Sequence, residues 1–236
     1  MNTGTKKRTN VTPGQLNYDH YETKQYDDEI KHVIPGWENV HLLIEEIINQ
    51  KVDKIGSVLE LGIGTGLTAG KILQYLPDVR YTGIDFSEQM LYGAKEKLKD
   101  YDVDYLLADY AKIDLPQNND LVVSVIGIHH QETDDDKKML FQKIYNSLNK
   151  NGAFIFADLV TYRDPQTAAF NDALHYHHLV KYAKNEQSLK EWAYHHKFLN
   201  KLAALEDQIY WLKEVGFRSV DVRYQEFNTA LIYAKK

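Results

Sequence analysis

Three glycines on alternate positions mark the part of the chain best suited to chemistry. They are Gly62, Gly64 and Gly66, and they follow an apolar run at 58–61 that is typical of a short buried strand. Because glycine lacks a Cβ and adopts positive φ readily, such a loop turns sharply and lets a ligand approach the backbone closely. Residues 67–76 after the loop have a helical pattern. Strand, glycine loop and helix start together predict a pocket for a nucleotide-like ligand.

The spacing of the glycines argues against two common phosphate-binding loops. A dinucleotide fingerprint needs glycine where this chain has Leu67, and a P-loop needs Gly-Lys-Ser/Thr, which is absent. Glu60, directly before the loop, places a carboxylate beside the ligand, which suits a cation or an amine better than a phosphate. The next predicted strand ends at Asp85, an acid that can accept hydrogen bonds from both hydroxyls of a ribose.

At these residues the chain resembles the class I S-adenosylmethionine (SAM) dependent methyltransferases of small-molecule type. The first motif of that family reads acid-Leu-Gly-x-Gly-x-Gly, as residues 60–66 do, and its second-strand acid matches Asp85. Met90 matches an apolar contact to the adenine, and Asp109 matches the acid that meets the adenine amino group. Each motif alone is a weak signal, but the four in this order are specific for the family. The resemblance covers residues 37–160 closely and the C-terminal strands in outline.

The resemblance implies that SAM is the cofactor and S-adenosylhomocysteine its product. Glu60 is expected near the methionine amino end, while Phe86 and Met90 flank the adenine. Ile126 is expected to face the methionine portion through its backbone. The full set of expected cofactor-binding residues is Tyr18, Glu60, Gly62, Gly64, Gly66, Asp85, Phe86, Met90, Asp109, Tyr110 and Ile126.

Two histidines and a tyrosine are the catalytic candidates. His129 and His130 follow the predicted strand 120–126, where ligands of open α/β sheets bind, and imidazole exchanges protons near neutral pH. In similar sequences the first histidine contacts the cofactor and the second packs behind it. Tyr18 and Tyr21 lie one helical turn apart. In the family an N-terminal helix with a Tyr-Asp pair closes the substrate side of the site. The resemblance therefore implies that Tyr21 lines this site, and the alternative is that its ring only packs the helix.

Strand-like and helix-like segments alternate along the chain, which predicts an α/β fold with a parallel sheet and right-handed crossovers. The expected strands are 56–61, 80–85, 103–107, 120–126, 152–158, 218–225 and 227–235. The expected sheet helices are 67–76, 87–99 and 134–149, after a core helix with Trp37, Val40, Ile44 and Ile47 on one face. The resemblance implies a three-layer sandwich with a seven-stranded, mostly parallel sheet of order 3-2-1-4-5-7-6.

We expect one SAM-dependent methyltransferase domain over residues 1–236. Its polar start, 1–16, is predicted to be a flexible tail, and helices within 17–50 are predicted to cover the site. Residues 160–205 do not fit the strand–helix alternation and are predicted to form a helical cap over the carboxyl edge of the sheet. One helical stripe is expected to run through Leu199, Leu202, Leu205, Ile209 and Leu212.

Composition excludes several classes of function. The 236 residues carry a net charge of -6 and no cysteine, which rules out disulfides, thiolate metal sites and a cysteine nucleophile. The charge disfavours a nucleic-acid partner, and no apolar run is long enough for a membrane span or a signal peptide. We therefore expect a cytoplasmic protein, compatible with a homodimer. His175 and His178 are three residues apart, but without acids or cysteines in the pattern we predict no metal site.

Three functions are compatible with these residues. The first is methyl transfer from SAM to an oxygen or nitrogen of a small organic acceptor, because the Asn/Asp-Pro-Pro-Tyr/Phe motif for base and glutamine amines is absent. The second is an enzyme similar to the carboxy-SAM synthases, which are linked to tRNA modification. Segment 33–40 resembles the stretch before the first strand in that family. That chemistry needs a cationic group, and Arg163 is the only arginine near the start of the cap. The third is a non-catalytic SAM-binding protein.

Overall fold

The computed structural model describes residues 22–236, and they form one seven-stranded sheet in the order β3-β2-β1-β4-β5-β7-β6. The expectations for the tail 1–16, for Tyr18 and for Tyr21 lie outside the described residues. All neighbouring strands are parallel except β7, which is antiparallel to both β5 and β6. The strands are β1 (Ser57–Leu61), β2 (Arg80–Asp85), β3 (Val103–Leu107), β4 (Asn119–Val125), β5 (Leu148–Leu159), β6 (Ser219–Glu226) and β7 (Thr229–Lys235). The predicted fold class and strand order are confirmed.

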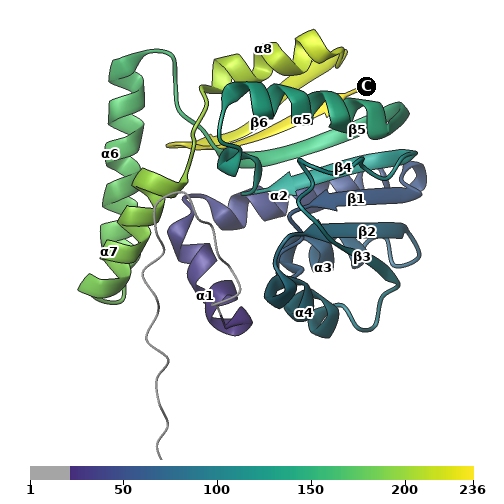
Figure 1. The fold of residues 1–236 in the computed structure, drawn as a ribbon, viewed down its shortest axis with the longest axis horizontal. Helices are drawn as coiled ribbons and strands as arrows, with labels where there is room; N and C mark the ends of the chain where they lie inside the picture. Colours follow the sequence, from purple (N-terminus) through teal and green to yellow (C-terminus); the bar gives the residue numbers. More distant parts are fainter. Residues whose placement is uncertain (1–21) are drawn as a thin grey trace, which may run out of the picture.

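Helices cover both faces of the sheet, and Figure 1 shows α5 and α8 on one side with α3 and α4 on the other. The helices are α1 (Thr23–Val33), α2 (Trp37–Asn49), α3 (Leu67–Leu73), α4 (Glu88–Lys97), α5 (Asp134–Ser147), α6 (Pro165–Tyr182), α7 (Glu186–Tyr194) and α8 (Leu205–Val215). Short helical turns are η1 (Val52–Lys54), η2 (Ile128–His130) and the π-helical η3 (His195–Leu199). No helix within residues 22–236 has the length and apolarity to cross a membrane.

The predicted helical stripe from Leu199 to Leu212 is wrong. The π-helical turn η3 ends at Leu199, and α8 begins only at Leu205. Between them Ala204 forms a parallel bridge with Thr161, and the amide of Leu205 donates to the Thr161 carbonyl at 2.8 Å. These backbone bonds hold the connection extended, so a contact between distant segments overrides the local pattern.

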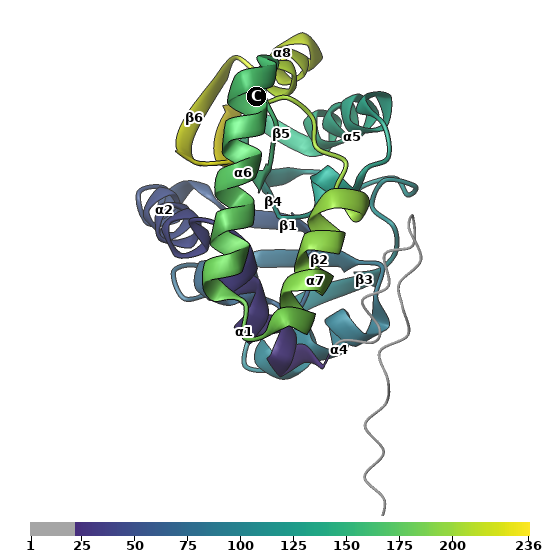
Figure 2. The same cartoon turned by 90° about the vertical axis from the view of Figure 1, so that its left-hand side faces the viewer.

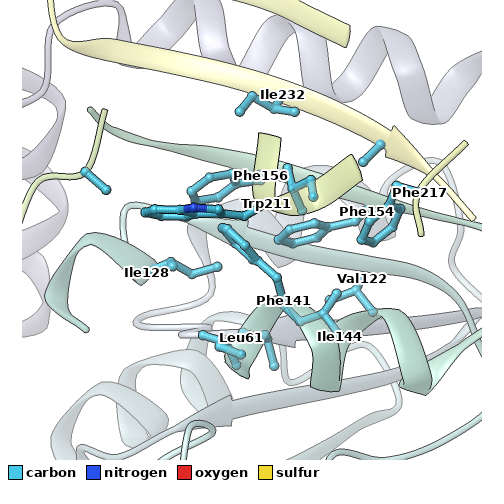
Figure 3. Close-up of a cluster of buried hydrophobic side chains, with 14 of the residues drawn as sticks. Leu61, Val122, Ile128, Phe141, Ile144, Phe154, Phe156, Trp211, Phe217 and Ile232 are labelled. Atoms are coloured by element: carbon cyan, nitrogen blue, oxygen red, sulfur yellow. The ribbon is translucent and has the colours of Figure 1, made fainter. Parts of the chain in front are cut away.

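Two buried clusters lie on opposite faces of the sheet. On one face, aromatic side chains of β5, α5 and α8 pack together with Phe217 (Figure 3). The ring centroids of Phe141 and Phe156 are 5.6 Å apart in an edge-to-face arrangement, which favours their contact beyond simple burial. On the other face, Ile44 and Ile48 of α2 are fully buried. Ile47, which the sequence pattern placed on the buried face of this helix, is only partly buried.

Helices α6 and α7 make up most of residues 160–205 and run alongside each other across one end of the sheet, with α1 near their lower ends (Figure 2). Asp164 caps α6, accepting from the Thr167 amide at 2.8 Å, and Pro165 occupies the first helical position. Asn185 caps α7 in the same way, accepting from the amide of Ser188. These caps fix where the two helices start, outside the strand–helix alternation of the sheet.

Glu60 lies in the middle of β1 with only 1% of its surface exposed. The hydroxyl of Tyr81 on β2 donates to its Oε2 at 2.6 Å. Burial raises the pKa of Glu60 from about 4.5 to about 8, and the hydrogen bond from Tyr81 only partly offsets this. At neutral pH the folded protein therefore holds Glu60 mainly as the neutral acid.

We predict that Glu60→Gln flattens the pH dependence of stability. Between pH 5 and 8 the unfolded chain has already released the Glu60 proton, whereas the folded chain retains it, so rising pH destabilises the wild type. The slope contributed by one proton is at most about 1.4 kcal/mol per pH unit. Urea unfolding at several pH values measures it. Parallel curves for the wild type and Glu60→Gln would contradict the neutral buried acid.

Candidate active site

The glycine loop connects β1 to α3, and its three glycines all have positive φ, at 76°, 56° and 80° for Gly62, Gly64 and Gly66. Such values favour glycine over any residue with a Cβ. Gly62 and Gly64 line a cavity, whereas Gly66 does not. A Cβ on Gly66 would lie 2.9 Å from Leu98 Cδ1, so this glycine allows close packing of α3 against the end of α4.

Asp85 ends β2, and its side chain holds two backbone segments. Its Oδ2 accepts from the Gly64 amide at 2.9 Å, and its Oδ1 accepts from the Ser87 amide at 2.9 Å. The side chain of Ser87 in turn caps α4 by accepting from the amide of Met90. A carboxylate offers about four acceptor positions. Asp85 also lines the cavity beside the loop, where a carboxylate is a suitable acceptor for a ligand diol.

The cavity beside this loop has a volume of about 410 Å³. It lies where β1, β2 and β4 end, as expected for a ligand site in a parallel sheet. Phe86 is about half exposed at its edge, while Met90 is buried in its wall. The expected residues that line it are Gly62, Gly64, Asp85, Phe86, Met90, Asp109, Tyr110 and Ile126. Glu60 and Gly66 do not line it, and the Glu60 carboxyl instead meets Tyr81.

Asp109 and Tyr110 follow β3 on the far side of the same cavity. The Asp109 carboxylate accepts from the Ala111 amide at 3.0 Å and pairs with Lys112 at 2.9 Å. The Tyr110 hydroxyl donates to the Gly127 carbonyl at 3.0 Å, which links this segment to the end of β4. Asp109 thus stabilises its own turn and also presents an acceptor edge to the cavity.

A second cavity of about 80 Å³ lies between α1, η2, α6 and α7. Its walls are mainly apolar side chains and imidazole rings. The residues that line it are Tyr26, Glu29, Ile30, Val33, Ile34, Ile126, His129, His130, Leu159, His175, Glu191, Trp192, His195, His196 and Asn200. Tyr26, Ile126 and His130 border both cavities. These three residues therefore form the shared wall between the two cavities.

Ile126 occupies this wall with an unusual backbone. Its φ is 55°, which is rare for a β-branched residue, and its amide donates to the Ala157 carbonyl at 2.8 Å. The bond to β5 holds the chain in this conformation as β4 turns into η2. Strained backbone of this kind is concentrated at functional sites, where surrounding contacts maintain it.

His129 is paired with Asp158 at the end of β5. The backbone amide of His129 donates to Asp158 Oδ2 at 2.8 Å, and its ring Nδ1 bonds the other carboxylate oxygen. Both side chains are almost fully buried. Because a carboxylate only accepts, Nδ1 carries the hydrogen and Nε2 is the nitrogen left with a lone pair. His129 borders the second cavity, which makes it a suitable proton acceptor there.

His130 stacks obliquely on His129, with ring centroids 3.9 Å apart, and lines both cavities. Burial and the neighbouring His129 hold the pKa of His130 well below its usual value, so its ring is neutral. The expected order of the two histidines is therefore reversed in space. His130 borders the larger cavity, and His129 packs behind it against Asp158.

Three further histidines border the second cavity from the cap. Burial lowers the pKa of His175 to about 3 and that of His195 to about 4. The pKa of His196 is also lowered, although its Nε2 bonds Asp172 at 2.7 Å. His175 bonds Asn228 through Nδ1. Within residues 22–236 no three His, Cys, Asp or Glu side chains are grouped so as to hold a metal ion.

Sequence reasoning missed Tyr26, Asp158 and Trp192 as members of this site. Asp158 carried a signal, because it is an acid at the carboxyl end of a predicted strand, as Asp85 is. Tyr26 belongs to the same tyrosine-rich stretch as the expected Tyr18 and Tyr21. Trp192 carried no local signal, since the packing of α7 against α6 brings it to the cavity.

Comparisons with known proteins agree with this geometry. Residues 58–152 match the family model described as "Methyltransferase domain". Proteins called "Uncharacterized methyltransferase" in Bacillus cereus and Bacillus anthracis are 34% identical over 135 residues, which is 57% of this chain and 58% of each relative. The aligned part of the chain thus spans little more than half the length of these relatives.

Solved structures share the fold at low sequence identity. An O-methyltransferase family protein from Burkholderia thailandensis has a TM-score of 0.65 at 13% identity, covering 91% of this chain and 59% of that one. Human N-acetylserotonin methyltransferase in complex with SAM has a TM-score of 0.55 at 16% identity, covering 94% of this chain and 60% of that one. Residues 58–152 thus match a methyltransferase domain, and the chain shares the strand order and the fold of the class I, Rossmann-like methyltransferases.

Proposed function

We propose that this protein is a SAM-dependent methyltransferase that acts on an oxygen or nitrogen of a small organic acceptor. The observation that carries the proposal is the pair of adjoining cavities with Tyr26, Ile126 and His130 between them. One cavity has the glycine loop and Asp85, and the other has the His129–Asp158 pair. A donor and an acceptor bound in the two cavities would meet at the shared wall.

The residues of the larger cavity fit SAM. A volume of about 410 Å³ is within the range of ligand pockets for molecules of this size. Asp85 offers acceptor positions for the ribose hydroxyls, Met90 and Phe86 offer apolar surface for the adenine, and the loop backbone permits close approach. When bound, SAM supplies a methyl group that is already activated by its sulfonium. The protein then has to position the acceptor and remove its proton.

His129 is the proposed base. An acceptor O–H or N–H facing the second cavity would give its proton to Nε2 of His129, and the resulting imidazolium would be stabilised by Asp158 through Nδ1. The buried carboxylate also fixes the tautomer and the ring orientation. The neutral ring of His130 adds no positive charge at the wall where the sulfonium is proposed to lie.

The size of the second cavity supports a small acceptor. It has about 80 Å³ and lies between helices α1, α6 and α7. A cavity of about 150 Å³ is known to hold a benzene ring. The part of the acceptor that enters must therefore be small, or the helices must separate slightly around it.

The carboxy-SAM alternative has less support. It needs a cationic group beside the cofactor. Arg163, the expected cation, lines neither cavity, and the cationic side chains that line the larger cavity are Lys112 and Lys201. Arg163 instead pairs with Asp207 of α8, with 60% of its side chain exposed. The non-catalytic alternative would leave the buried His129–Asp158 pair beside the second cavity without a role.

Mass spectrometry and calorimetry test the proposal. Purified protein is titrated with SAM, S-adenosylhomocysteine and NAD, and then incubated with SAM and a panel of small alcohols, phenols and amines. Micromolar binding of both SAM species and formation of a product 14 Da heavier than its acceptor are expected. A co-purified SAM adduct carrying an extra carboxylate would favour the alternative. Failure to bind either SAM species would refute the proposal.

We predict that Asp85→Asn weakens SAM binding about five- to hundredfold. The amide side chain keeps the size of Asp85 but loses the charge and half of the acceptor positions, which costs about 1–3 kcal/mol for charge-assisted hydrogen bonds. Calorimetry with SAM measures the change. Asp104→Asn, on the exposed side of β3, is the matched control and should bind as the wild type does. Unchanged affinity in a folded Asp85→Asn variant would remove Asp85 from the cofactor site.

We predict that His129→Gln lowers kcat about a hundred- to ten-thousandfold, the usual contribution of a positioned general base. SAM affinity should change little, because His129 does not line the larger cavity. Release of S-adenosylhomocysteine with any acceptor that turns over provides the rate. His177→Ala, on the exposed side of α6, serves as control. A His129→Gln enzyme with near-normal kcat would assign the proton transfer to another group or to solvent.

A further inference from the structure

A buried lysine holds the end of the turn that carries the two central histidines. Only 1% of the surface of Lys137, on α5, is exposed, and its Nζ donates to the Gln131 carbonyl at 2.7 Å. Burial lowers the pKa of Lys137, while nearby carboxylates, Asp134 first and Asp158 next, oppose this shift. Lys137 lines neither cavity, so it does not contact a bound cofactor or acceptor.

The carbonyl that Lys137 binds follows the short turn η2. The Gln131 amide donates to the Ile128 carbonyl at 2.9 Å, which closes the turn around His129 and His130. Gln131 itself lines the larger cavity. The ammonium of Lys137 thus fixes the point at which the chain leaves η2.

Other elements hold the start and the middle of the same turn. At its start, the Tyr110 hydroxyl donates to the Gly127 carbonyl at 3.0 Å. In its middle, the His129 amide donates to Asp158 of β5 at 2.8 Å. The His129 carbonyl accepts from the Lys201 amide of the cap at 2.9 Å. The turn is thus fixed along its whole length, and the buried lysine is the contact at its end.

Packing alone does not explain a lysine at position 137. A buried ammonium is costly to the fold unless acceptors or acids surround it. A methionine side chain has a similar length and would fill the same space without a charge. The ammonium is therefore better explained by the carbonyl that it binds.

We propose that Lys137 is a positioning residue for methyl transfer. By holding the Gln131 carbonyl from α5, it keeps His129 beside the second cavity and His130 in the wall between the two cavities. The proposal rests on the proposed function, because that function assigns the tasks of the two histidines. Lys137 acts through η2 and not on the reacting atoms.

Hydrogen exchange tests the positioning without turnover. The ligand-free wild type is compared with Lys137→Met, which keeps the length of the side chain and removes the ammonium. We expect the amides of residues 128–131 to exchange about tenfold faster in the variant, because a charge-assisted bond to their turn is lost. If Lys137→Met does not fold, Lys137→Gln, with a shorter neutral side chain, is measured in its place with the same expectation.

Lys236→Met is the matched control. The Lys236 ammonium donates to the Tyr145 and Leu148 carbonyls at the opposite end of α5, at 2.6 and 2.7 Å. This variant also loses bonds from a lysine to backbone carbonyls, but η2 is not involved, so residues 128–131 should exchange as in the wild type. Equal acceleration of these amides in both variants, or none in the Lys137 variant, would overturn the inference.

Kinetics connect the turn to the reaction. With an acceptor that turns over, Lys137→Met should lower kcat about ten- to hundredfold, as expected when reacting groups are slightly displaced, and change the KM for SAM little. Lys137→Arg keeps a cationic donor and should recover most of kcat. A loosened η2 with normal kcat would refute the positioning role.

The two proposals fail in different ways. If methyl transfer is found but exchange of the η2 amides is unchanged in Lys137→Met, the inference about Lys137 fails and the proposed function stands. If neither SAM nor S-adenosylhomocysteine binds, the proposed function fails, and the role of Lys137 in methyl transfer is withdrawn with it, even where η2 loosens.

Discussion

The carboxylate of Asp85 determines the shape of the site. By accepting from the amides of Gly64 and Ser87, it joins the glycine loop after β1 to the start of α4 after β2. Both segments leave neighbouring parallel strands at the same edge of the sheet. The larger cavity lies beside these two segments, and the same side chain is the proposed partner of the ribose. The geometry of the loop and the proposed ribose contact therefore depend on the same residue.

Helix α1 connects the glycine loop to the second cavity. Asp27 accepts from the hydroxyl of Thr65 in the glycine loop and pairs with Lys97 at the end of α4. On the same helix, Tyr26 borders both cavities and Glu29 borders the second. The second cavity is thus completed by a helix that contacts the glycine loop through Thr65. A disturbed loop would be expected to alter both binding steps.

The parts of the structure that the sequence predicted are those encoded locally. Strand 80–85 with its terminal acid and the Gly62–Gly66 loop carry their signals within a few residues, and the order of strands follows from the family resemblance. Predictions failed where a distant contact decided the outcome. Thr161 holds residues 201–204 extended and breaks the expected helical stripe, and Tyr81 receives the Glu60 carboxyl in the core. The reversed order of His129 and His130 likewise follows from Asp158, nearly thirty residues away.

Burial gives the histidines of this site a consistent chemical character. A cavity lined by five imidazoles would repel a cation if the rings were protonated, but lowered pKa values keep His130, His175, His195 and His196 neutral. His129 differs because its Nδ1 is held by a buried carboxylate, which compensates the charge that it would gain on accepting a proton. The buried carboxylate of Asp158 thus equips His129 to become an imidazolium. This difference is the strongest structural reason to assign proton removal to His129 and not to His130.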